Sequence, residues 1–548
     1  MTPRKKSIAR ASQFRSFALR DGWGNRRFGP RRRPPGAPRE DGSESSQGDD
    51  DADGSTTNPV DQAGVWPASL EPTVGAMTAT ARSQSALSSP PPIGQSSNQN
   101  PIVRWLVFLL LAGSVLRLGL WFVYGPVAYP DTGTYMRPAQ NILARDFSNY
   151  DGRRPPGYPL VLAIAALSPD ATWALQMLMG LAISVLLFYV AFVLTRRPGL
   201  AALAGMTYNL NLSQLFYEAN LLSETTTTFA TTGVAALLLV SYRRIHYKRR
   251  VWPWLLGLGL LTAFATLTRP QFVFLPLLTA TLIGYASCGR AGTSVWRSAG
   301  RIGLTFLTST LLILGCCWFN YTKVGFFTLS TQTGMVLMEH TLAFIELAPD
   351  RYATIRDIYV RHRDAKLAQT GRHTATWDGL PEAMATTGLS LPALSNELAR
   401  MSIEMFIRHP VRYATGVAHA WTDFWAAPMH WQPAMLRVRL VRRFVGLVWR
   451  LEQPILRLAN AVFVALVAVA TLSPVLRHRL RWDLGFTTLA AIVLGASLVQ
   501  ALTIWVDNAR YAITVQPLVV VIVLSAVHRL TVSSEAILVT HSKAGKET

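Results

Sequence analysis

The chain has 548 residues, of which 50% are hydrophobic and only 15% are charged, and its formal net charge is +22. Soluble domains carry roughly 25% charged residues, and the apolar residues here gather in blocks of roughly 20, the length that crosses a bilayer as a helix. Composition therefore excludes an ordinary soluble protein and predicts an all-α polytopic membrane protein. The basic residues cluster in short connectors between apolar blocks, as in membrane proteins, so the charge does not indicate nucleic-acid binding.

Residues 1–100 differ in composition from the rest of the chain. They pass from a basic stretch through the acidic "EDGSESSQGDDDADGS" to a Ser/Pro/Gln-rich stretch, and such segments bury too little apolar surface to fold. No short apolar core follows the basic start, so this is not a signal peptide. We predict a disordered, solvated cytoplasmic tail, with lipid-headgroup binding or regulation as the functional alternative. Residues 531–548 are predicted to form a second, short cytoplasmic tail.

Residues 101–530 form the predicted transmembrane domain. Apolar length and periodicity predict about ten spans. These are residues 104–124, 173–194, 199–217, 221–241, 252–268, 271–287, 301–319, 456–475, 484–504 and 511–529.

Charged connectors predict the orientation of these spans. The Lys/Arg-rich connectors fall on one side with both termini, which makes that side cytoplasmic. Two long loops, 125–172 and 320–455, then lie outside and are expected to carry juxtamembrane helices. The basic stretch 436–460 also falls outside, and its mixture of cations with apolar residues is typical of a helix in the headgroup plane. In the alternative topology this stretch is cytoplasmic and the last three spans are inverted.

Carboxylates and arginines gather at the outer ends of the predicted spans. These residues are Asp131, Arg153, Arg154, Glu218, Glu224, Arg269 and Arg510. Ionisable groups at such depths are costly and indicate function. Arginine binds phosphate oxygens through a planar fork, and a neighbouring carboxylate can act as a general base. Together they predict glycosyl transfer from a sugar carried on a polyprenyl phosphate.

Six motifs occur in an order that matches a known class of enzymes. They are "PDTGTYMRPAQNIL", "RRPPGYPLVLAI", "LLSETTTTF", "ATLTRPQFVFLPL", "NYTKVGFFTLSTQTGMVLMEH" and "NARYAITVQPLVVV". With them the chain resembles, from about residue 104 to residue 530, the GT-C class of integral-membrane glycosyltransferases. Within that class it is similar to the branch of protein mannosyltransferases and bacterial enzymes that decorate lipid A and cell-surface glycans.

The resemblance implies a role for each candidate residue. Asp131 would be the catalytic carboxylate, and the donor phosphate would be bound by Arg153, Arg154, Arg269 and Arg510. Supporting or acceptor-binding roles would fall to Tyr135, Tyr158, Glu218, Glu224, Glu339, His340 and Tyr511. One position departs from the pattern, because Thr132 stands where many relatives have a second acid. No cofactor is certain, and the loss of that acid weakens the case for a divalent metal without removing it.

The loop residues also have ordinary structural interpretations. Asp131 would cap the helix that follows it, and one of Arg153 and Arg154 would extend to lipid headgroups.

The candidate residues near the predicted spans also have ordinary structural interpretations. Glu224 would form a buried ion pair with Arg269, and Arg510 would pair with its neighbour Asp507. His340 would be a surface histidine.

Two classes of function follow, and a third remains open. The leading hypothesis is an inverting hexosyl- or pentosyltransferase that moves a sugar from a polyprenyl-phosphate donor to an envelope lipid, glycan or protein. It would act at the outer, periplasmic face of the cytoplasmic membrane. The alternative is a transporter or flippase of a lipid-linked sugar, but the internal repeat common in transporters is not found. The third possibility is a non-catalytic scaffold in envelope assembly.

Overall fold

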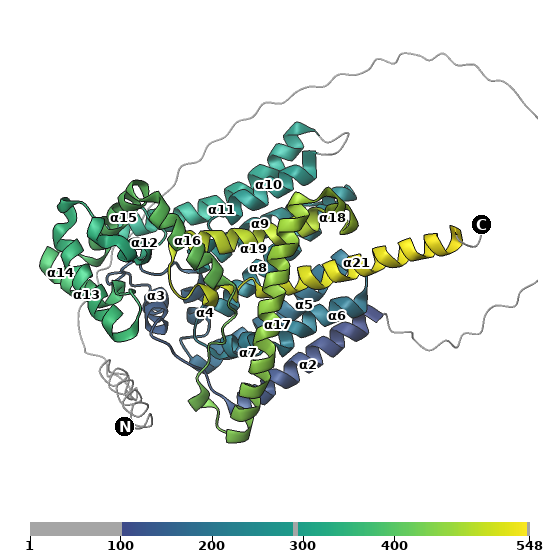
Figure 1. Ribbon diagram of the computed structural model, residues 1–548, viewed down its shortest axis with the longest axis horizontal. Coiled ribbons are helices and arrows are strands. Elements are labelled where there is room, and N and C mark those ends of the chain that lie inside the picture. The colour runs from purple at the N-terminus through teal and green to yellow at the C-terminus, as the bar shows by residue number, and fades with distance from the viewer. Residues whose placement is uncertain (1–100, 289–293, 545–548) are drawn as a thin grey trace, which may run out of the picture. The chain divides into compact units, whose positions relative to one another are not determined.

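The structure, a computed structural model, describes residues 101–288 and 294–544, with side chains up to residue 532. The predicted N-terminal tail and most of the short C-terminal tail lie outside the residues whose side chains are described. Within the described part the regular elements are helices, and an isolated bridge between Val127 and Asn220 is the one extended pairing. The predicted all-α fold is confirmed (Figure 1).

Helices occupy every segment that the sequence predicts to span the membrane. They are α2 (Pro101–Val123), α5 (Pro169–Thr195), α6 (Pro198–Leu210), α7 (Leu212–Ala219), α8 (Glu224–His246), α9 (Trp252–Thr268), α10 (Leu275–Cys288), α11 (Val295–Val324), α17 (Arg439–Leu472), α19 (Leu484–Thr503) and α21 (Gln516–Ala544). Among the described residues, six helical stretches are long and apolar enough to cross a membrane. A polytopic membrane protein follows, whereas the exact number of ten spans stays a prediction.

The third predicted span is two helices rather than one. Asn211 has an extended backbone between α6 and α7, and its side chain accepts a hydrogen bond from the amide of Gln214 at 2.9 Å. An asparagine that bonds a nearby backbone amide favours a helix start over a helix interior. The prediction of one continuous span at residues 199–217 is therefore wrong.

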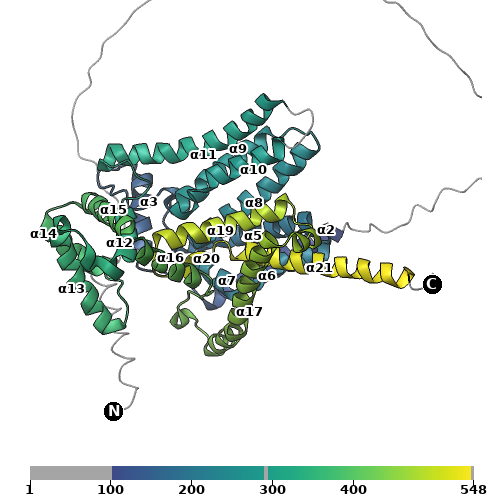
Figure 2. The ribbon, with the colours of Figure 1, turned by 45° about the horizontal axis from the view of Figure 1, so that its top comes forward.

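The basic stretch 436–460 and the eighth predicted span form one continuous helix, α17. Its 34 residues include Pro454. At 1.5 Å per residue the helix is about 51 Å long, more than the roughly 30 Å of a hydrocarbon core. Most of the basic stretch and most of the eighth predicted span therefore belong to the same helix (Figures 1 and 2).

Helices of the two long loops gather at one end of the bundle, which we call the loop end (left in Figure 1). The first loop gives α3 (Thr132–Ala144) and α4 (Gly157–Ile164). The second gives α12 (Thr333–Thr341), α13 (Ala353–Thr370), α14 (Thr376–Thr387), α15 (Leu391–Arg408) and α16 (Pro410–Phe424). The second-loop helices share their own apolar cluster, which includes Met335, Leu394 and Met405. The predicted loop helices are thus confirmed.

Short elements complete the chain. They are α18 (Pro474–Arg479), α20 (Asn508–Ala512) and the 3-10 helices η2 (Pro270–Phe272), η3 (Leu342–Leu347), η4 (Asp350–Tyr352) and η5 (Pro433–Met435).

The threonine-rich helix α8 lies buried among α5, α9, α10 and α19. Its first turns carry buried threonines, and Thr227 and Thr228 donate to the carbonyls of Ser223 and Glu224 at 2.7 and 2.9 Å. Hydroxyls satisfied by the preceding turn can be buried without a penalty for an unpaired donor. A polar helix therefore sits inside the bundle and brings Glu224 to the loop end.

Orientation of the bundle gives the first testable prediction. Arg529 of α21 donates to the carbonyls of Leu194, Leu480 and Arg481, so the basic connectors before α6 and after α18 share one end. We expect that end to be cytoplasmic. Reporter fusions after residue 247 should read cytoplasmic, and a fusion near residue 380 should read external. A cytoplasmic reading near residue 380 would reverse the predicted orientation.

Candidate active site

The segment that carries Asp131 is fixed by backbone pairing with the turn between α7 and α8. The amide of Val127 donates to the carbonyl of Ala219, and its own carbonyl accepts from Leu221, both at 2.9 Å. Thr132, at the position of the missing second acid, donates its hydroxyl to the Leu221 carbonyl at 3.0 Å. Thr132 thus ties α3 to this turn.

Asp131 precedes α3 but makes no capping hydrogen bond to it. Its two oxygens instead face two arginines: Oδ1 lies 3.0 Å from Nη2 of Arg154, and Oδ2 lies 3.0 Å from Nη1 of Arg510. Burial raises the pKa of Asp131, but the two guanidinium groups outweigh burial and hold that pKa below its ordinary value. The helix-cap interpretation is wrong, and the carboxylate is charged at neutral pH.

Arg154 is held in place from several sides. Its Nε donates to Thr134 Oγ1 at 2.9 Å, and its guanidinium lies over the ring of Tyr135, 4.5 Å from the centroid. Gly157 allows this loop to approach α9, because a Cβ at that position would lie 2.4 Å from Thr268 Oγ1 and 2.6 Å from its amide nitrogen. The glycine of the "RRPPGYP" motif therefore brings Arg154 close to the end of α9.

Glu224 forms the second acidic centre of the site. Its Oε1 lies 2.8 Å from Nη2 of Arg269 and also pairs with Nε of Arg510. Arg269 in turn donates to Ser223 Oγ at 2.9 Å and lies over the ring of Tyr511 at 4.6 Å. The Glu224–Arg269 ion pair expected from the sequence is confirmed. The Asp507 interpretation of Arg510 is wrong, because Arg510 bridges Asp131 and Glu224.

The cations of this cluster exceed its anions. Four arginines, at positions 153, 154, 269 and 510, face two carboxylates, which gives +4 − 2 = +2 if all are charged. Arg153 makes no ion pair within residues 101–288 and 294–532, and its Nε is buried without a hydrogen-bond partner. Nη1 of Arg269 is likewise buried and unpartnered. The cluster has spare donors and a net charge that attracts an anion.

A cavity of about 320 Å³ opens against this cluster. Its lining includes Asp131 and the four arginines together with aliphatic side chains. The aliphatic residues are Val273, Leu329, Val336, Leu337, Val499 and Ile504. A ligand with a charged head and a hydrocarbon tail suits a lining that contains both kinds of side chain.

Two glutamines on the cavity were missed in the sequence. Gln271 has neither side-chain nitrogen nor oxygen in a hydrogen bond, and Nε2 of Gln500 is also buried and unpartnered. The signal for Gln271 was its place directly after the Thr-Arg-Pro break. The signal for Gln500 was a polar residue in an apolar helix.

Not every predicted residue reaches the cavity. Tyr135 and Tyr511 line it, while Tyr158 packs behind Tyr135 edge to face at 5.1 Å. Glu218 lies elsewhere, in a buried bidentate pair with Arg117 of α2.

Glu339 and His340 are buried in α12, and neither is among the cavity-lining residues. The surface interpretation of His340 is wrong, because its side chain is 1% exposed.

The acids present do not fit a divalent cation. Both carboxylates already face arginines, and the excess of positive charge opposes a further cation. In the part of the chain that the structure describes, no three His, Cys, Asp or Glu side chains are grouped as metal ligands.

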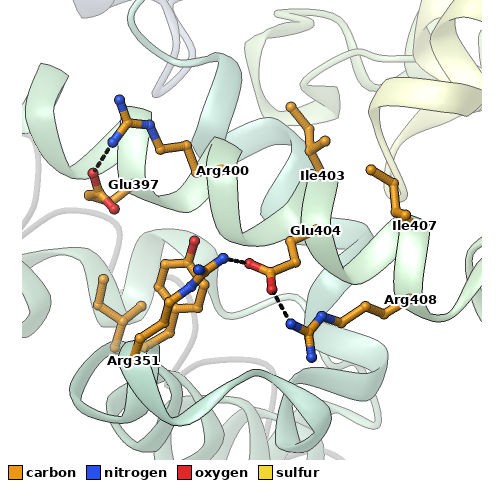
Figure 3. Close-up of a pocket in the computed structure, with 9 residues that line it drawn as sticks. Arg351, Glu397, Arg400, Ile403, Glu404, Ile407 and Arg408 are labelled. Atoms are coloured by element: carbon orange, nitrogen blue, oxygen red, sulfur yellow. Dashed lines mark hydrogen bonds and ion pairs between the residues drawn. The ribbon is translucent and has the colours of Figure 1, made fainter.

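A second hollow lies on the second loop, between η4 and α15 (Figure 3). Figure 3 shows Glu404 between Arg351 and Arg408, and Glu397 bonded to Arg400. Each arginine there is paired with a carboxylate, in contrast to Arg153 in the cavity beside Asp131.

Comparison with known proteins gives structural likeness only. No protein-family model matches the chain, and no curated protein matches it. An apo oligosaccharyltransferase from Archaeoglobus fulgidus aligns with 77% of this chain at 15% identity and a TM-score of 0.42, and the chain spans 50% of its length. The archaeal oligosaccharyltransferase AglB from the same organism, in complex with an inhibitory peptide and a dolichol-phosphate, aligns with 81% of this chain and 52% of its own at 14% identity and a TM-score of 0.41.

ArnT from Cupriavidus metallidurans, bound to undecaprenyl phosphate, aligns with 78% of both chains at 15% identity and a TM-score of 0.33. With TM-scores below 0.5, the likeness by itself establishes no activity for this chain.

Proposed function

We propose that the protein is a membrane glycosyltransferase that moves a sugar from a polyprenyl-phosphate donor to an envelope acceptor. The observation that supports this most directly is the cavity beside Asp131. The charged cluster at the cavity, Glu224 included, has a net charge of +2 and unpartnered arginine donors, and aliphatic side chains also line the cavity. A phosphate on an isoprenoid chain has a charged part for the arginines and an apolar part for the aliphatic residues, and the carboxylate of Asp131 lies in the same cavity.

The proposed reaction is a displacement at the anomeric carbon of the sugar. The acceptor, an alcohol or amine of a lipid, glycan or protein, attacks C1 and forms a C1–O or C1–N bond. The bond from C1 to the phosphate oxygen breaks, and its electron pair leaves with the polyprenyl phosphate. Asp131 takes the proton that the acceptor loses. Every atom and charge is then accounted for without a metal or cofactor.

The arginines act on the leaving group. A polyprenyl-phosphate sugar is a phosphodiester with one negative charge, and the polyprenyl phosphate that leaves gains a second. Donors placed where this charge develops stabilise the transition state more than the ground state. Arg153 and Nη1 of Arg269 have free N–H groups for this purpose, while Arg154 and Arg510 orient Asp131.

The decisive experiment uses purified protein and a panel of radiolabelled polyprenyl-phosphate sugars with hexose or pentose groups. Release of polyprenyl phosphate together with transfer of label to an envelope acceptor supports the proposal. Movement of the intact labelled lipid across a vesicle membrane, with no release from any donor, would support the flippase instead. Detection of label on a periplasmic acceptor in cells would place the reaction at the outer face of the cytoplasmic membrane.

The arginines give the second testable prediction. Arg153→Lys keeps the charge but loses the planar fork, so donor affinity should fall. A bidentate contact is worth about 1.5–3 kcal/mol as a charge-assisted bond, which is roughly a 10- to 100-fold change. Binding of a labelled polyprenyl phosphate to the purified variant measures it.

The matched control for this measurement is Arg400→Lys, at the hollow of Figure 3, where each arginine is already paired. Donor affinity there should stay at the native value. If Arg153→Lys, Arg154→Lys, Arg269→Lys and Arg510→Lys all bind the donor like the native protein, the phosphate site lies elsewhere.

A further inference from the structure

The last turn of α12 carries two buried polar side chains that the proposed reaction does not use. Glu339 is 7% exposed and His340 is 1% exposed. Both face residues 501–507, the segment that joins the end of α19 to α20, which carries Arg510. Two ionisable groups buried against one short segment call for a reason, because burial of such groups is costly unless they hold something in place.

His340 anchors the first half of this segment. Its Nε2 lies 3.0 Å from the carbonyl oxygen of Ala501, and its ring meets the ring of Trp505 edge to face at 5.7 Å. His419 stacks on Trp505 at 5.1 Å, and His373 lies 5.0 Å from it. Three histidines from three parts of the second loop therefore surround one tryptophan of the segment.

A glycine in α16 provides the space for this contact. A Cβ at Gly416 would lie 2.7 Å from Cζ3 of Trp505 and 3.1 Å from Nδ1 of His340. Any larger residue at this position would displace the tryptophan or the histidine. The close approach of α16 thus fixes the tryptophan from the other side.

Glu339 reaches the second half of the segment. The backbone amides of Val506 and Trp505 approach its carboxyl group closely enough to favour the charged form, while its Oε2 has no hydrogen-bond partner. Burial, with a smaller contribution from Asp507, nevertheless raises the pKa of Glu339 to about 8. Burial thus favours the uncharged acid at this position, next to the backbone of Trp505 and Val506.

The segment leads directly to Arg510 through a tight turn. The side chain of Asn508 donates to the carbonyls of Ile504 and Trp505 at 3.0 and 2.9 Å, and the amide of Arg510 donates to the carbonyl of Asp507 at 2.9 Å. Asp507 has a φ of +56°, in the left-handed region that aspartate adopts more readily than most non-glycine residues. The turn that sets the start of α20, and with it the position of Arg510, is therefore closed by these local hydrogen bonds and continues directly from the segment beside His340.

We propose that Glu339 and His340 are positioning residues that clamp residues 501–507 and thereby hold Arg510 against Asp131 and Glu224. The inference rests on the proposed function in one respect, because Arg510 is then the arginine that orients the catalytic carboxylate. Glu339 and His340 would then act on the active site although neither lines the cavity. Binding of an acceptor to the second loop would act on catalysis through this clamp.

The test compares two uncharged replacements of Glu339. Glu339→Gln keeps a polar oxygen beside the backbone of Val506 and Trp505, whereas Glu339→Leu has a similar volume and no acceptor. A displacement of about 1 Å at a catalytic group can lower the rate roughly 100-fold. We expect kcat to fall about 10- to 100-fold in Glu339→Leu, with little change in donor KM, and to stay within about threefold of native in Glu339→Gln.

The control for this pair is Glu397→Gln, a half-buried residue of α15 at the hollow of Figure 3, which should leave kcat unchanged. A Glu339→Leu protein with native kcat, or a Glu339→Gln protein as impaired as Glu339→Leu, would overturn the clamp. In the second case the acid itself would be required, which is a chemical rather than a positioning role.

A pH profile separates the clamp from simple packing. As pH rises through about 8, native Glu339 becomes charged next to Asp507, the buried site is destabilised, and kcat should fall. Glu339→Gln has no proton to lose and should lack this alkaline limb.

The other titratable or charged groups around the clamp are His340, His373, His419, Arg363, Asp507 and Tyr413. Burial lowers the pKa of His340 to about 4 and also lowers that of His373, so neither accounts for a limb near pH 8. An alkaline limb that persists in Glu339→Gln counts against the clamp.

A second readout does not depend on catalysis. Amide hydrogen exchange of residues 504–512 reports how firmly the segment is held. Exchange should accelerate in Glu339→Leu and in Gly416→Ala but not in Glu339→Gln or Glu397→Gln. If no donor is turned over by the native protein, the proposed function fails while this pattern still tests the clamp. Equal exchange in all five proteins would overturn the clamp whatever the activity.

Discussion

Asp131→Asn should reduce turnover of the donor by about 10²–10⁴-fold, the contribution typical of a general base. The amide is nearly the same size as the carboxylate, but at neutral pH it cannot take the proton that the acceptor loses. No helix cap is lost, because Asp131 makes no capping hydrogen bond in the structure. The measurement is single-turnover release of polyprenyl phosphate from a labelled donor by purified native and variant protein.

Donor binding separates this result from a folding defect. Arg153 and Arg269 keep their unpartnered N–H groups in the variant, so affinity for polyprenyl phosphate should stay within a few-fold of native. Removal of one negative charge makes the cluster more positive, and a modest gain in affinity is consistent with that. A variant that transfers sugar at the native rate would reduce Asp131 to an orienting partner of Arg154 and Arg510.

The sequence predicted which residue types meet at the candidate site better than it predicted how they meet. Acids and arginines at the ends of apolar blocks stand out because such groups are rare near a bilayer. Their pairing depends on contacts between residues far apart in sequence: Asp131 and Arg510 are 379 residues apart. Nothing in the local sequence indicates that Arg510 pairs with the distant Asp131 rather than with Asp507, three residues before it. The helix-cap interpretation of Asp131 failed for the same reason, since two distant guanidinium groups compete for the carboxylate.

Local chemistry also overrode apolar length in two places. Asn211 ends α6 and starts α7 within a block long enough to span a membrane, because its side chain bonds the backbone of the next turn. In α17 the composition changes from basic to apolar residues, yet the helix continues without a break. Hydropathy reports where residues prefer to lie, whereas helix ends depend on backbone hydrogen bonds. The apolar helices were therefore located well, and the points where they begin, end and join were not.

The contrast between Glu218 and Glu224 shows why burial alone did not identify the site. Both glutamates are 1% exposed, and both pair with arginine. Glu224 shares its arginines with a cavity, whereas Glu218 faces only residues of the bundle. Arg117 donates to it through Nε at 2.8 Å and Nη2 at 2.6 Å, and Tyr208 donates at 3.2 Å. The structure thus separates an ion pair that can act on a substrate from one that can act only on the fold.

Glu218→Leu should accordingly lower stability rather than the intrinsic rate. Removal of one partner leaves the Arg117 charge buried, with Asn209 and a backbone carbonyl as its remaining partners, and loss of one member of a buried ion pair costs about 3–5 kcal/mol. Thermal unfolding of the purified protein in detergent should shift to lower temperature by several degrees. Turnover per folded molecule, measured well below the transition, should equal that of the native protein.

A double substitution shows whether the stability loss comes from the unpaired charge. Arg117→Leu combined with Glu218→Leu removes both charges, and replacement of a buried pair by apolar residues is often close to neutral. The double variant should therefore be more stable than Glu218→Leu alone, which is a positive coupling in the mutant cycle. Two results would contradict this account. One is a double variant as unstable as the sum of its single variants. The other is a folded Glu218→Leu protein whose turnover falls as far as that of Asp131→Asn, since that outcome would return Glu218 to the chemistry.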